Sequence, residues 1–245
     1  MKFARLKSNL TERPRLLLIF GVKDTSNDKY PAQIVMDALR LIGYVISKIF
    51  WFISYNGLEN IPNRSSGSFL IAANHQTYAD PVWIVLPMRR RLRFMAYDKA
   101  FEWRIIGPLI TYLGAFPVSM EVGGTLKAMK ESLRALRDGA VLTVFPEGAR
   151  EFENGEMFEF KTGAVRIALQ AGVPILPVTI SGGNGIWPQK QKYPRLFRRV
   201  EVTYHPLLLV AEDETLELHE NLDIWTAKLK EIVSSAAAPG RVWEK

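Results

Sequence analysis

The distribution of hydrophobic and polar residues along the chain predicts alternating strands and helices after residue 67. Short apolar runs indicate strands, and segments with apolar residues at helical spacing separate them. The predicted strands cover residues 68–73, 93–96, 115–118, 140–145, 175–180, 200–204 and 207–210. The predicted helices cover residues 81–88, 102–113, 125–137, 162–170 and 222–234. This alternation is typical of an α/β fold with a mostly parallel, mixed central sheet flanked by helices.

Two segments rich in Gly, Asn and Ser predict irregular structure. Residues 56–67 are expected to form a linker with turns, and residues 182–185 a loop. We therefore divide the chain into an N-terminal basic and hydrophobic region, residues 1–55, and a single α/β domain, residues 56–245. The length of 245 residues suffices for one sizeable hydrophobic core.

Residues 32–55 predict an amphipathic helix with an unusually wide apolar face. The polar residues gather in one arc of about 100°, and they are Gln33, Asp37, Arg40, Tyr44, Ser47 and Lys48. Because charged residues interrupt the segment, no uncharged stretch is long enough to span a bilayer. The pattern favours a helix that lies in a membrane surface, and a deeply buried core helix is the alternative.

The composition narrows the classes of partner. A formal net charge of +7 indicates an anionic partner, and basic residues concentrate in residues 1–23, 89–93 and 190–199. These clusters are not interleaved with aromatic residues in a recognised nucleic-acid module, so we expect a lipid surface and no nucleic acid. The chain has no cysteine, which excludes disulfides and a cysteine nucleophile. No pattern of a cleavable signal peptide is evident, and we expect a peripheral or monotopic protein on the cytoplasmic face of a membrane.

His75 lies between a predicted strand and a helix predicted to have Pro81 as its first residue. A neutral imidazole accepts a proton near pH 7, and a carboxylate can fix its tautomer. Asp80, expected at the N-cap, can be that partner if the intervening turn brings the two together. A turn with a capping aspartate explains the same spacing without any chemistry. The other histidines, His205 and His219, are interpreted as structural or surface residues.

A second polar segment follows the strand predicted at residues 140–145. Gly148 permits backbone conformations that other residues avoid. Arg150 offers a planar guanidinium suited to phosphate, and Glu147 can hydrogen-bond a hydroxyl. Lys161, beside a predicted helix start, also favours an anion. A surface turn with a local ion pair is the alternative. Like the first segment, this one follows the carboxyl end of a predicted strand, where open α/β sheets bind ligands.

In this order, the segments resemble the glycerolipid acyltransferase family, whose members include 1-acyl-sn-glycerol-3-phosphate acyltransferases. Residues 74–80 are similar to the family's His-x4-Asp motif, and residues 145–150 to its Phe-Pro-Glu-Gly-x-Arg motif. Residues 173–178 are similar to its later proline-containing strand. The resemblance extends from about residue 57 to residue 206, which is most of the chain.

The resemblance implies an acyltransferase domain over residues 56–245 and a membrane-associated O-acyl transfer in phospholipid biosynthesis. It implies that His75 is the general base and that Asp80 orients it, so that a hydroxyl of a lysophosphatidate-like acceptor attacks an acyl thioester directly. The donor is acyl-CoA or an acyl-carrier protein as co-substrate, and no cofactor or metal is implied. The residues implied in substrate binding are Asn74, Glu147, Gly148, Arg150, Lys161 and Pro174.

One position departs from the family pattern and leaves the acceptor open. The family commonly has Gly-Ala-Phe-Pro-Val-Asp-Arg where this chain has residues 114–120 ending in Met120. A hydrogen bond to a charged group contributes about 1.5–3 kcal/mol, so the loss of this Arg matters for phosphate binding. Either another cation, such as Arg104, Arg150 or Lys161, makes the contact, or the acceptor is another lysophospholipid, a glycolipid or an amino lipid.

A different class of function is a basic, non-catalytic lipid- or nucleic-acid-binding protein. It accounts for the charge but gives His75 and Glu147 no role. A serine hydrolase is disfavoured because the chain lacks a Gly-x-Ser-x-Gly motif. A nucleotide kinase is disfavoured because the chain lacks a phosphate-binding loop of the Gly-x4-Gly-Lys type.

Overall fold

The computed structural model describes residues 31–118, 124–150, 156–188, 191 and 193–237. These residues form a seven-stranded sheet with the order β1-β7-β6-β2-β5-β3-β4. The strands are β1 (Ser54–Asn56), β2 (Leu70–Ala73), β3 (Leu92–Tyr97), β4 (Ala115–Val118), β5 (Val141–Val144), β6 (Ile175–Ser181) and β7 (Glu201–Tyr204). The five strands from β6 to β4 in this order are parallel, while β7 is antiparallel to β6 and parallel to β1. The prediction of a mostly parallel, mixed sheet flanked by helices is confirmed.

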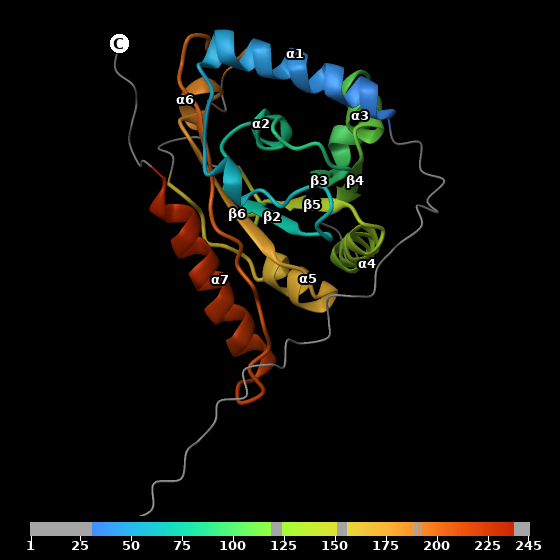
Figure 1. Cartoon of the computed structure of the whole chain (residues 1–245), viewed down its shortest axis with the longest axis vertical. Helices are drawn as coiled ribbons and strands as arrows, with labels where there is room; N and C mark the ends of the chain where they lie inside the picture. The colour runs from blue at the N-terminus through green and yellow to red at the C-terminus, as the bar shows by residue number, and fades with distance from the viewer. Residues whose placement is uncertain (1–30, 119–123, 151–155, 189–190, 192, 238–245) are drawn as a thin grey trace, which may run out of the picture.

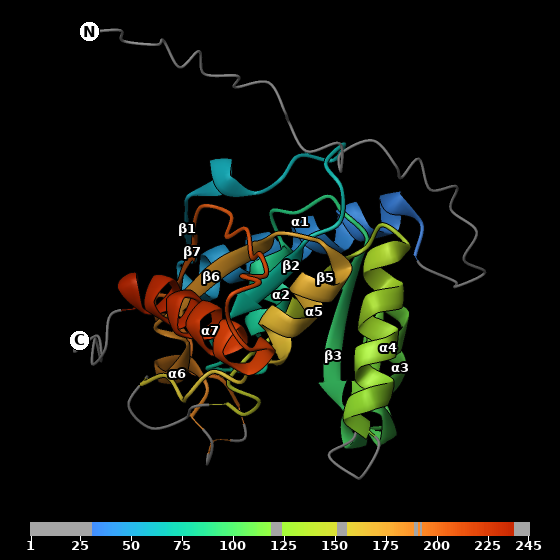
Figure 2. The same ribbon diagram turned by 90° about the horizontal axis from the view of Figure 1, so that it is seen from below.

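Helices cover both faces of the sheet (Figure 1). They are α1 (Gln33–Trp51), α2 (Asp80–Val85), α3 (Ile106–Tyr112), α4 (Gly124–Arg137), α5 (Gly163–Ala171), α6 (Gly183–Ile186) and α7 (Leu218–Ser235), with the 3-10 helices η2 (Leu58–Asn60) and η3 (Asp98–Glu102). Helices α1 and α2 lie over one face of the sheet. Figure 2 shows α4, α5 and α7 next to one another over the opposite face.

The central strand β2 contributes to two hydrophobic cores, one on each face of the sheet. Ile71 and Ala73 belong to the core that includes residues of α2. Leu70 and Ala72 belong to the core formed with α4, α5 and α7. Successive side chains of a strand point to opposite faces, and helices cover both faces here. This is why β2 is a continuous apolar run rather than an alternating one.

Helix α1 ends earlier than predicted because the backbone of Phe52 adopts a left-handed conformation with φ 41°. The chain then enters β1, which pairs with β7. The predicted linker at residues 56–67 therefore begins inside the sheet, and β1 crosses the predicted boundary between residues 55 and 56. The predicted loop at residues 182–185 is also wrong, because α6 forms there.

Three further local predictions need correction. In residues 207–210 only Leu208 forms an isolated bridge, to Ile175, so this segment is not a strand. Of the helix predicted at residues 102–113, only Ile106–Tyr112 is helical as α3, and η3 ends at Glu102, where the prediction begins. Helix α2 begins at Asp80 with Ala79 as its N-cap, and the Asp80 side chain makes no cap hydrogen bond. Its carboxylate instead turns back toward the preceding loop, which matters for the site described below.

Helix α1 directs its polar arc toward the protein and its apolar arc outward. Arg40 is 8% exposed and donates to the Asp37 carboxylate at 3.1 Å, whereas Ile34 and Leu41 are 77% and 65% exposed. A helix packed on a water-soluble core shows the reverse arrangement. The alternative of a deeply buried core helix is therefore wrong. Among the described residues, no helix combines the length and hydropathy needed to cross a bilayer.

Candidate active site

The topology places the two predicted motifs at one edge of the sheet. Strands β2 and β5 are parallel neighbours, with Ala72 opposite Val144. The loop that follows β2 and the turn that follows β5 therefore leave the sheet side by side. The backbone N–H of His75 donates to Oε1 of Glu147 at 2.7 Å, so the two motifs are in direct contact.

His75 and Asp80 form a hydrogen-bonded pair. Nδ1 of His75 lies 2.8 Å from Oδ2 of Asp80, and the two side chains are 19% and 0% exposed. The same Oδ2 accepts from the backbone N–H groups of Gln76 at 2.6 Å and Thr77 at 2.8 Å, while Oδ1 accepts from the Thr77 hydroxyl at 2.8 Å. Four donors thus balance the burial of the carboxylate. They also hold residues 75–80 as a tight loop that brings base and carboxylate together.

The imidazole of His75 is oriented from two sides. Its ring stacks on Phe145, with centroids 4.0 Å apart and planes 18° from parallel. Because Asp80 is an acceptor, Nδ1 of His75 carries a proton and Nε2 presents a lone pair on the far side of the ring. This tautomer is the one that a general base requires.

Glu147 lies buried beneath the His75 loop. Its Oε1 accepts from the backbone of His75, and its Oε2 accepts from the backbone N–H of Phe158 at 2.8 Å. The carboxylate therefore connects the loop after β2 with the segment that leads to α5. From the sequence, Glu147 is predicted to hydrogen-bond the hydroxyl of the acceptor. In the structure both carboxylate oxygens bind backbone groups, and the binding role stays a prediction.

Two cations lie close to the turn that follows β5. Gly148 has φ 68°, a backbone conformation that favours glycine, and a Cβ atom at this position would lie 2.7 Å from Nζ of Lys161. The backbone N–H of Lys161 donates to the carbonyl of Pro146 at 2.9 Å. Cζ of Arg150 lies 3.3 Å from the ring centroid of Tyr78. Lys161 and Arg150, both predicted from the sequence, thus lie beside this turn, and Arg150 also contacts the loop that carries His75.

The other predicted binding residues have different placements. Asn74 is buried, and its amide accepts from the N–H of Ile180 at 2.7 Å and donates to its carbonyl at 2.9 Å, which ties the His75 loop to β6. Pro174 precedes β6 and therefore lies at the opposite end of the sheet from His75. The substrate-binding roles of both residues stay predictions. Met120 lies outside the described residues.

Sequence reasoning missed the contributions of Gln76 and Tyr78. Buried Gln76 accepts from the backbone N–H of Gly183 at 2.9 Å, which ties the loop to α6. A Cβ atom at Gly183 would lie 2.9 Å from Oε1 of Gln76, so the glycine permits this approach. A glycine-rich segment such as residues 182–185 can indicate a close approach of some other group to the backbone. The sequence did not show that this group is the side chain of Gln76. Tyr78 carried no signal, because its partners come from distant segments.

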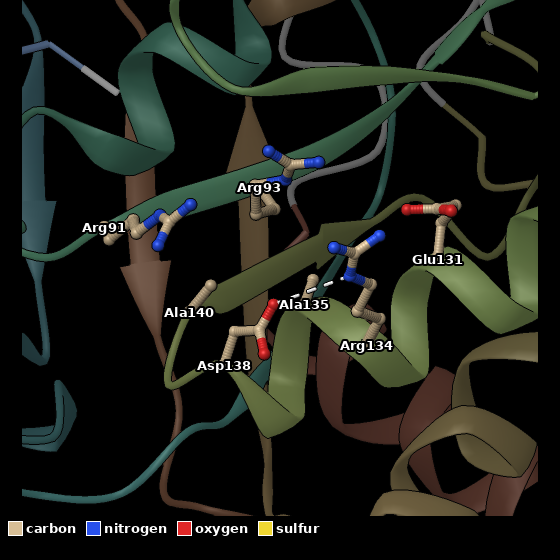
Figure 3. Close-up of a pocket in the computed structure, with 7 residues that line it drawn as sticks. All are labelled: Arg91, Arg93, Glu131, Arg134, Ala135, Asp138 and Ala140. Atoms are coloured by element: carbon tan, nitrogen blue, oxygen red, sulfur yellow. Dashed lines mark ion pairs between the residues drawn. The ribbon is translucent and has the colours of Figure 1, made fainter. Parts of the chain in front are cut away.

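A polar hollow of about 90 Å³ lies at the other end of the sheet (Figure 3). Arg91 and Arg93 reach it from β3 and the residue before it, and α4 contributes Arg134 and Glu131, with Asp138 just after the helix. It is at the amino ends of β3 and β5, whereas His75 and Glu147 follow the carboxyl ends of β2 and β5. Its carboxylates oppose its guanidinium groups, and it offers no imidazole. The candidate reactive site is therefore still the region around His75 and Asp80.

The family is established by comparison with known sequences. The sequence model of the family described as Acyltransferase matches residues 52–181, a range that includes both motifs. The chain therefore belongs to the acyltransferase family, which confirms the resemblance inferred from the motifs.

Two relatives are named as 1-acyl-sn-glycerol-3-phosphate acyltransferases. The chloroplastic LPAT1 of Arabidopsis thaliana is 30% identical over 140 residues, which cover 57% of this chain and 38% of the relative. The protein of Streptococcus pneumoniae is 32% identical over 140 residues, which cover 55% and 50%. The matched segment thus spans no more than half the length of these two relatives.

A solved structure has a similar fold. The crystal structure of PlsC from Thermotoga maritima, a 1-acyl-sn-glycerophosphate (LPA) acyltransferase, matches with a TM-score of 0.61 and 26% identity. The match covers 82% of this chain and 80% of that chain. The α/β arrangement described above is therefore that of a known acyltransferase.

Proposed function

We propose that the protein transfers a fatty acyl group from an acyl thioester to the free hydroxyl of lysophosphatidate, a step of phospholipid biosynthesis. The observation that carries this proposal is the His75–Asp80 pair, with 2.8 Å between Nδ1 and Oδ2 at the carboxyl end of the sheet. The names of the relatives from Arabidopsis thaliana and Thermotoga maritima support the choice of acceptor.

The chemistry follows from the tautomer of His75. Nε2 removes the proton of the acceptor hydroxyl while that oxygen attacks the thioester carbonyl carbon. Asp80 stabilises the imidazolium through Nδ1. The tetrahedral intermediate then collapses, the C–S bond breaks, and the thiolate takes the proton from Nε2. The products are a new oxygen ester and a free thiol, with no acyl-enzyme intermediate.

Arg150 and Lys161 are the cations that we assign to the acidic headgroup. Both lie by the turn after β5, in contact with Tyr78 and close to Gly148 respectively. A guanidinium binds phosphate with paired N–H donors, and an ammonium adds a point charge. This pair can replace the arginine that the family has where this chain has Met120.

The decisive experiment measures product formation with purified protein in detergent micelles. We expect phosphatidate from lysophosphatidate and a labelled acyl-CoA or acyl-carrier protein thioester, and His75→Ala should abolish it. Parallel reactions with lysophosphatidylcholine, lysophosphatidylethanolamine and a glycolipid test the alternative acceptors raised by Met120. Transfer to one of these instead of lysophosphatidate would establish the alternative acceptor. If no lipid is acylated from either thioester, the proposal is contradicted.

Helix α1 supports a position on a membrane surface, which we place at the cytoplasmic face. Its exposed apolar arc includes Ile34, Leu41, Ile42, Val45 and Ile49. An interfacial helix buries such an arc among lipid headgroups and acyl chains. The basic residues of the chain favour anionic lipids.

Flotation with vesicles of phosphatidylglycerol and phosphatidylcholine tests this position. The double variant Leu41→Glu, Ile42→Glu should release the protein from the vesicles. Leu126→Glu, which changes an exposed leucine of α4 over the other face of the sheet, is the matched control and should still float. Equal flotation of both variants would refute the role of α1.

A further inference from the structure

We propose that Tyr78 is a positioning residue, whose ring holds the guanidinium of Arg150 in the orientation that binds the acceptor headgroup. The proposal rests on the proposed function, in which Arg150 contacts that headgroup. It adds a residue that acts on the acceptor through another side chain.

The contact between Arg150 and Tyr78 is unusually close. Cζ of Arg150 lies 3.3 Å from the ring centroid, well inside the limit of about 6 Å for a cation–π interaction. At this separation the guanidinium lies over the face of the ring. Stacking of this kind engages the face of the guanidinium, whereas its N–H donors lie in its plane. The same side chain can therefore be held by Tyr78 and present hydrogen-bond donors to a phosphate.

Tyr78 is itself held by two other aromatic residues. Trp187, just after α6, meets it edge-on, with centroids 5.4 Å apart and planes at 66°. Trp103, just after η3, meets it at 6.2 Å and 59°. Tyr78 is nevertheless 48% exposed, so this cluster lies at the protein surface, where a lipid headgroup can approach. Two segments that are distant in the sequence thus contact the same ring.

The position of Tyr78 also connects Arg150 with the catalytic base. Tyr78 lies between Thr77 and Asp80, in the loop that the Asp80 carboxylate holds through the N–H and hydroxyl of Thr77. The Thr77 hydroxyl also accepts from the N–H of Ala79 at 3.0 Å. The loop that orients His75 therefore also places the ring under Arg150. Through this connection Tyr78 links the position of Arg150 to the loop that carries His75.

Kinetics of two variants test the role of the ring. Tyr78→Leu should raise KM for lysophosphatidate about threefold to tenfold, the ratio expected for loss of one partly exposed cation–π contact. Its kcat and its KM for the acyl thioester should stay near the wild-type values. Tyr78→Phe keeps the ring and should restore KM for lysophosphatidate. Tyr112→Leu makes the same change at a tyrosine of similar exposure on α3 and is the matched control.

A double-mutant cycle with Arg150→Leu shows whether Tyr78 acts through Arg150. In that background, Tyr78→Leu should add no further increase in KM. The proposal is overturned if the increase is equally large without Arg150, if Tyr78→Phe is as impaired as Tyr78→Leu, or if Tyr78→Leu lowers kcat alone.

A binding measurement separates this proposal from the proposed function. If the wild-type protein acylates no lysophosphatidate, the proposed function fails, but equilibrium binding still tests Tyr78. We expect wild type to bind lysophosphatidate more tightly than Tyr78→Leu, with no difference between the two proteins for monoacylglycerol, which has no phosphate for Arg150 to bind. Equal binding of lysophosphatidate by both proteins would contradict the role of Tyr78.

Discussion

His75 and His205 lie in two polar networks that differ in exposure, partner and tautomer. Nδ1 of His75 faces the Asp80 carboxylate, and its side chain is partly exposed. Nε2 of His205 lies 2.8 Å from the Thr179 hydroxyl, in a buried network between β6, the end of β7 and α7. The Thr179 hydroxyl donates its proton to the carbonyl of Val233, so it must accept from Nε2–H of His205.

The two histidines therefore have opposite proton positions. His75 keeps a basic Nε2 directed away from its carboxylate, whereas His205 uses Nε2–H to connect three elements of the fold. Burial also lowers the pKa of His205. Both histidines follow a strand, so that position does not distinguish them. What makes His75 a candidate base is that its partner, Asp80, accepts from one ring nitrogen and leaves the other nitrogen without a proton. We expect variants in the His75 network to change the reaction rate and variants in the His205 network to change the stability of the fold.

Removal of the His75 imidazole gives the largest expected effect. His75→Ala should lower kcat about 10³-fold or more, because general-base catalysis contributes about 10²–10⁴-fold. The midpoint of thermal unfolding should fall only modestly, because three of the four donors to the Asp80 carboxylate remain. Initial rates of phosphatidate formation and thermal unfolding measure the two effects. His219→Ala, at an exposed histidine of α7, is the control, and a similar loss of rate there would break the comparison.

Neutralisation of Asp80 should give the next largest effect. Asp80→Asn should lower kcat about 10²-fold, because an amide no longer stabilises the imidazolium that forms on His75. The profile of rate against pH measures the change together with kcat. Asp223→Asn is the control at an exposed carboxylate of α7. An Asp80→Asn protein with the wild-type rate and pH profile would show that His75 acts without its partner.

Replacement of Glu147 should lower both kcat and the free energy of unfolding, with a smaller effect on kcat than the two changes above. Glu147→Gln replaces one acceptor oxygen by a donor, so either the His75 or the Phe158 backbone N–H loses its partner. A buried group left without a partner costs about 1–3 kcal/mol in unfolding free energy. Displacement of the His75 loop should lower kcat about tenfold. Denaturant unfolding and initial rates test this, and a change in only one of them would contradict the coupling.

His205 should affect stability and leave the rate almost unchanged. His205→Leu should lower the unfolding free energy by about 1 kcal/mol through loss of the hydrogen bond to Thr179. Because the pKa of His205 is below its ordinary value of 6.5, the unfolded chain binds a proton more readily than the folded one. The contribution of His205 to stability is therefore present above pH 6.5 and decreases as the pH falls below that value.

The matched variant for this prediction is His205→Gln, which keeps an N–H donor but does not titrate. Denaturant unfolding of wild type and His205→Gln between pH 8 and pH 5 should show a smaller loss of stability in the variant. A parallel decline in the two proteins would refute the assignment. A large fall in kcat for His205→Leu would show that the two networks are not separate.

Much of the fold was predictable because its signals are local. The predicted strand at 115–118 coincides with β4, and that at 175–180 lies within β6. The strand predicted at 207–210 failed because apolar residues alone do not supply a neighbouring strand along their full length. In the site, the spacing of His75 and Asp80 indicated a pair, but a capping aspartate explained it equally well. Only the direction of the Asp80 carboxylate decides between the two.

The sequence by itself determined the order of strands β2 to β7 and of the longer helices, the wide apolar arc of α1, and the segments that carry the candidate base and the cations. Apolar runs, helical spacing and turn residues act over a few positions, so they can be recognised in the chain. The tertiary structure decided that α1 directs its polar arc inward, that Glu147 supports the His75 backbone, and that Arg150 lies on Tyr78. Each of these depends on which strands become neighbours, because β2 and β5 are distant in the chain and meet only when the sheet forms.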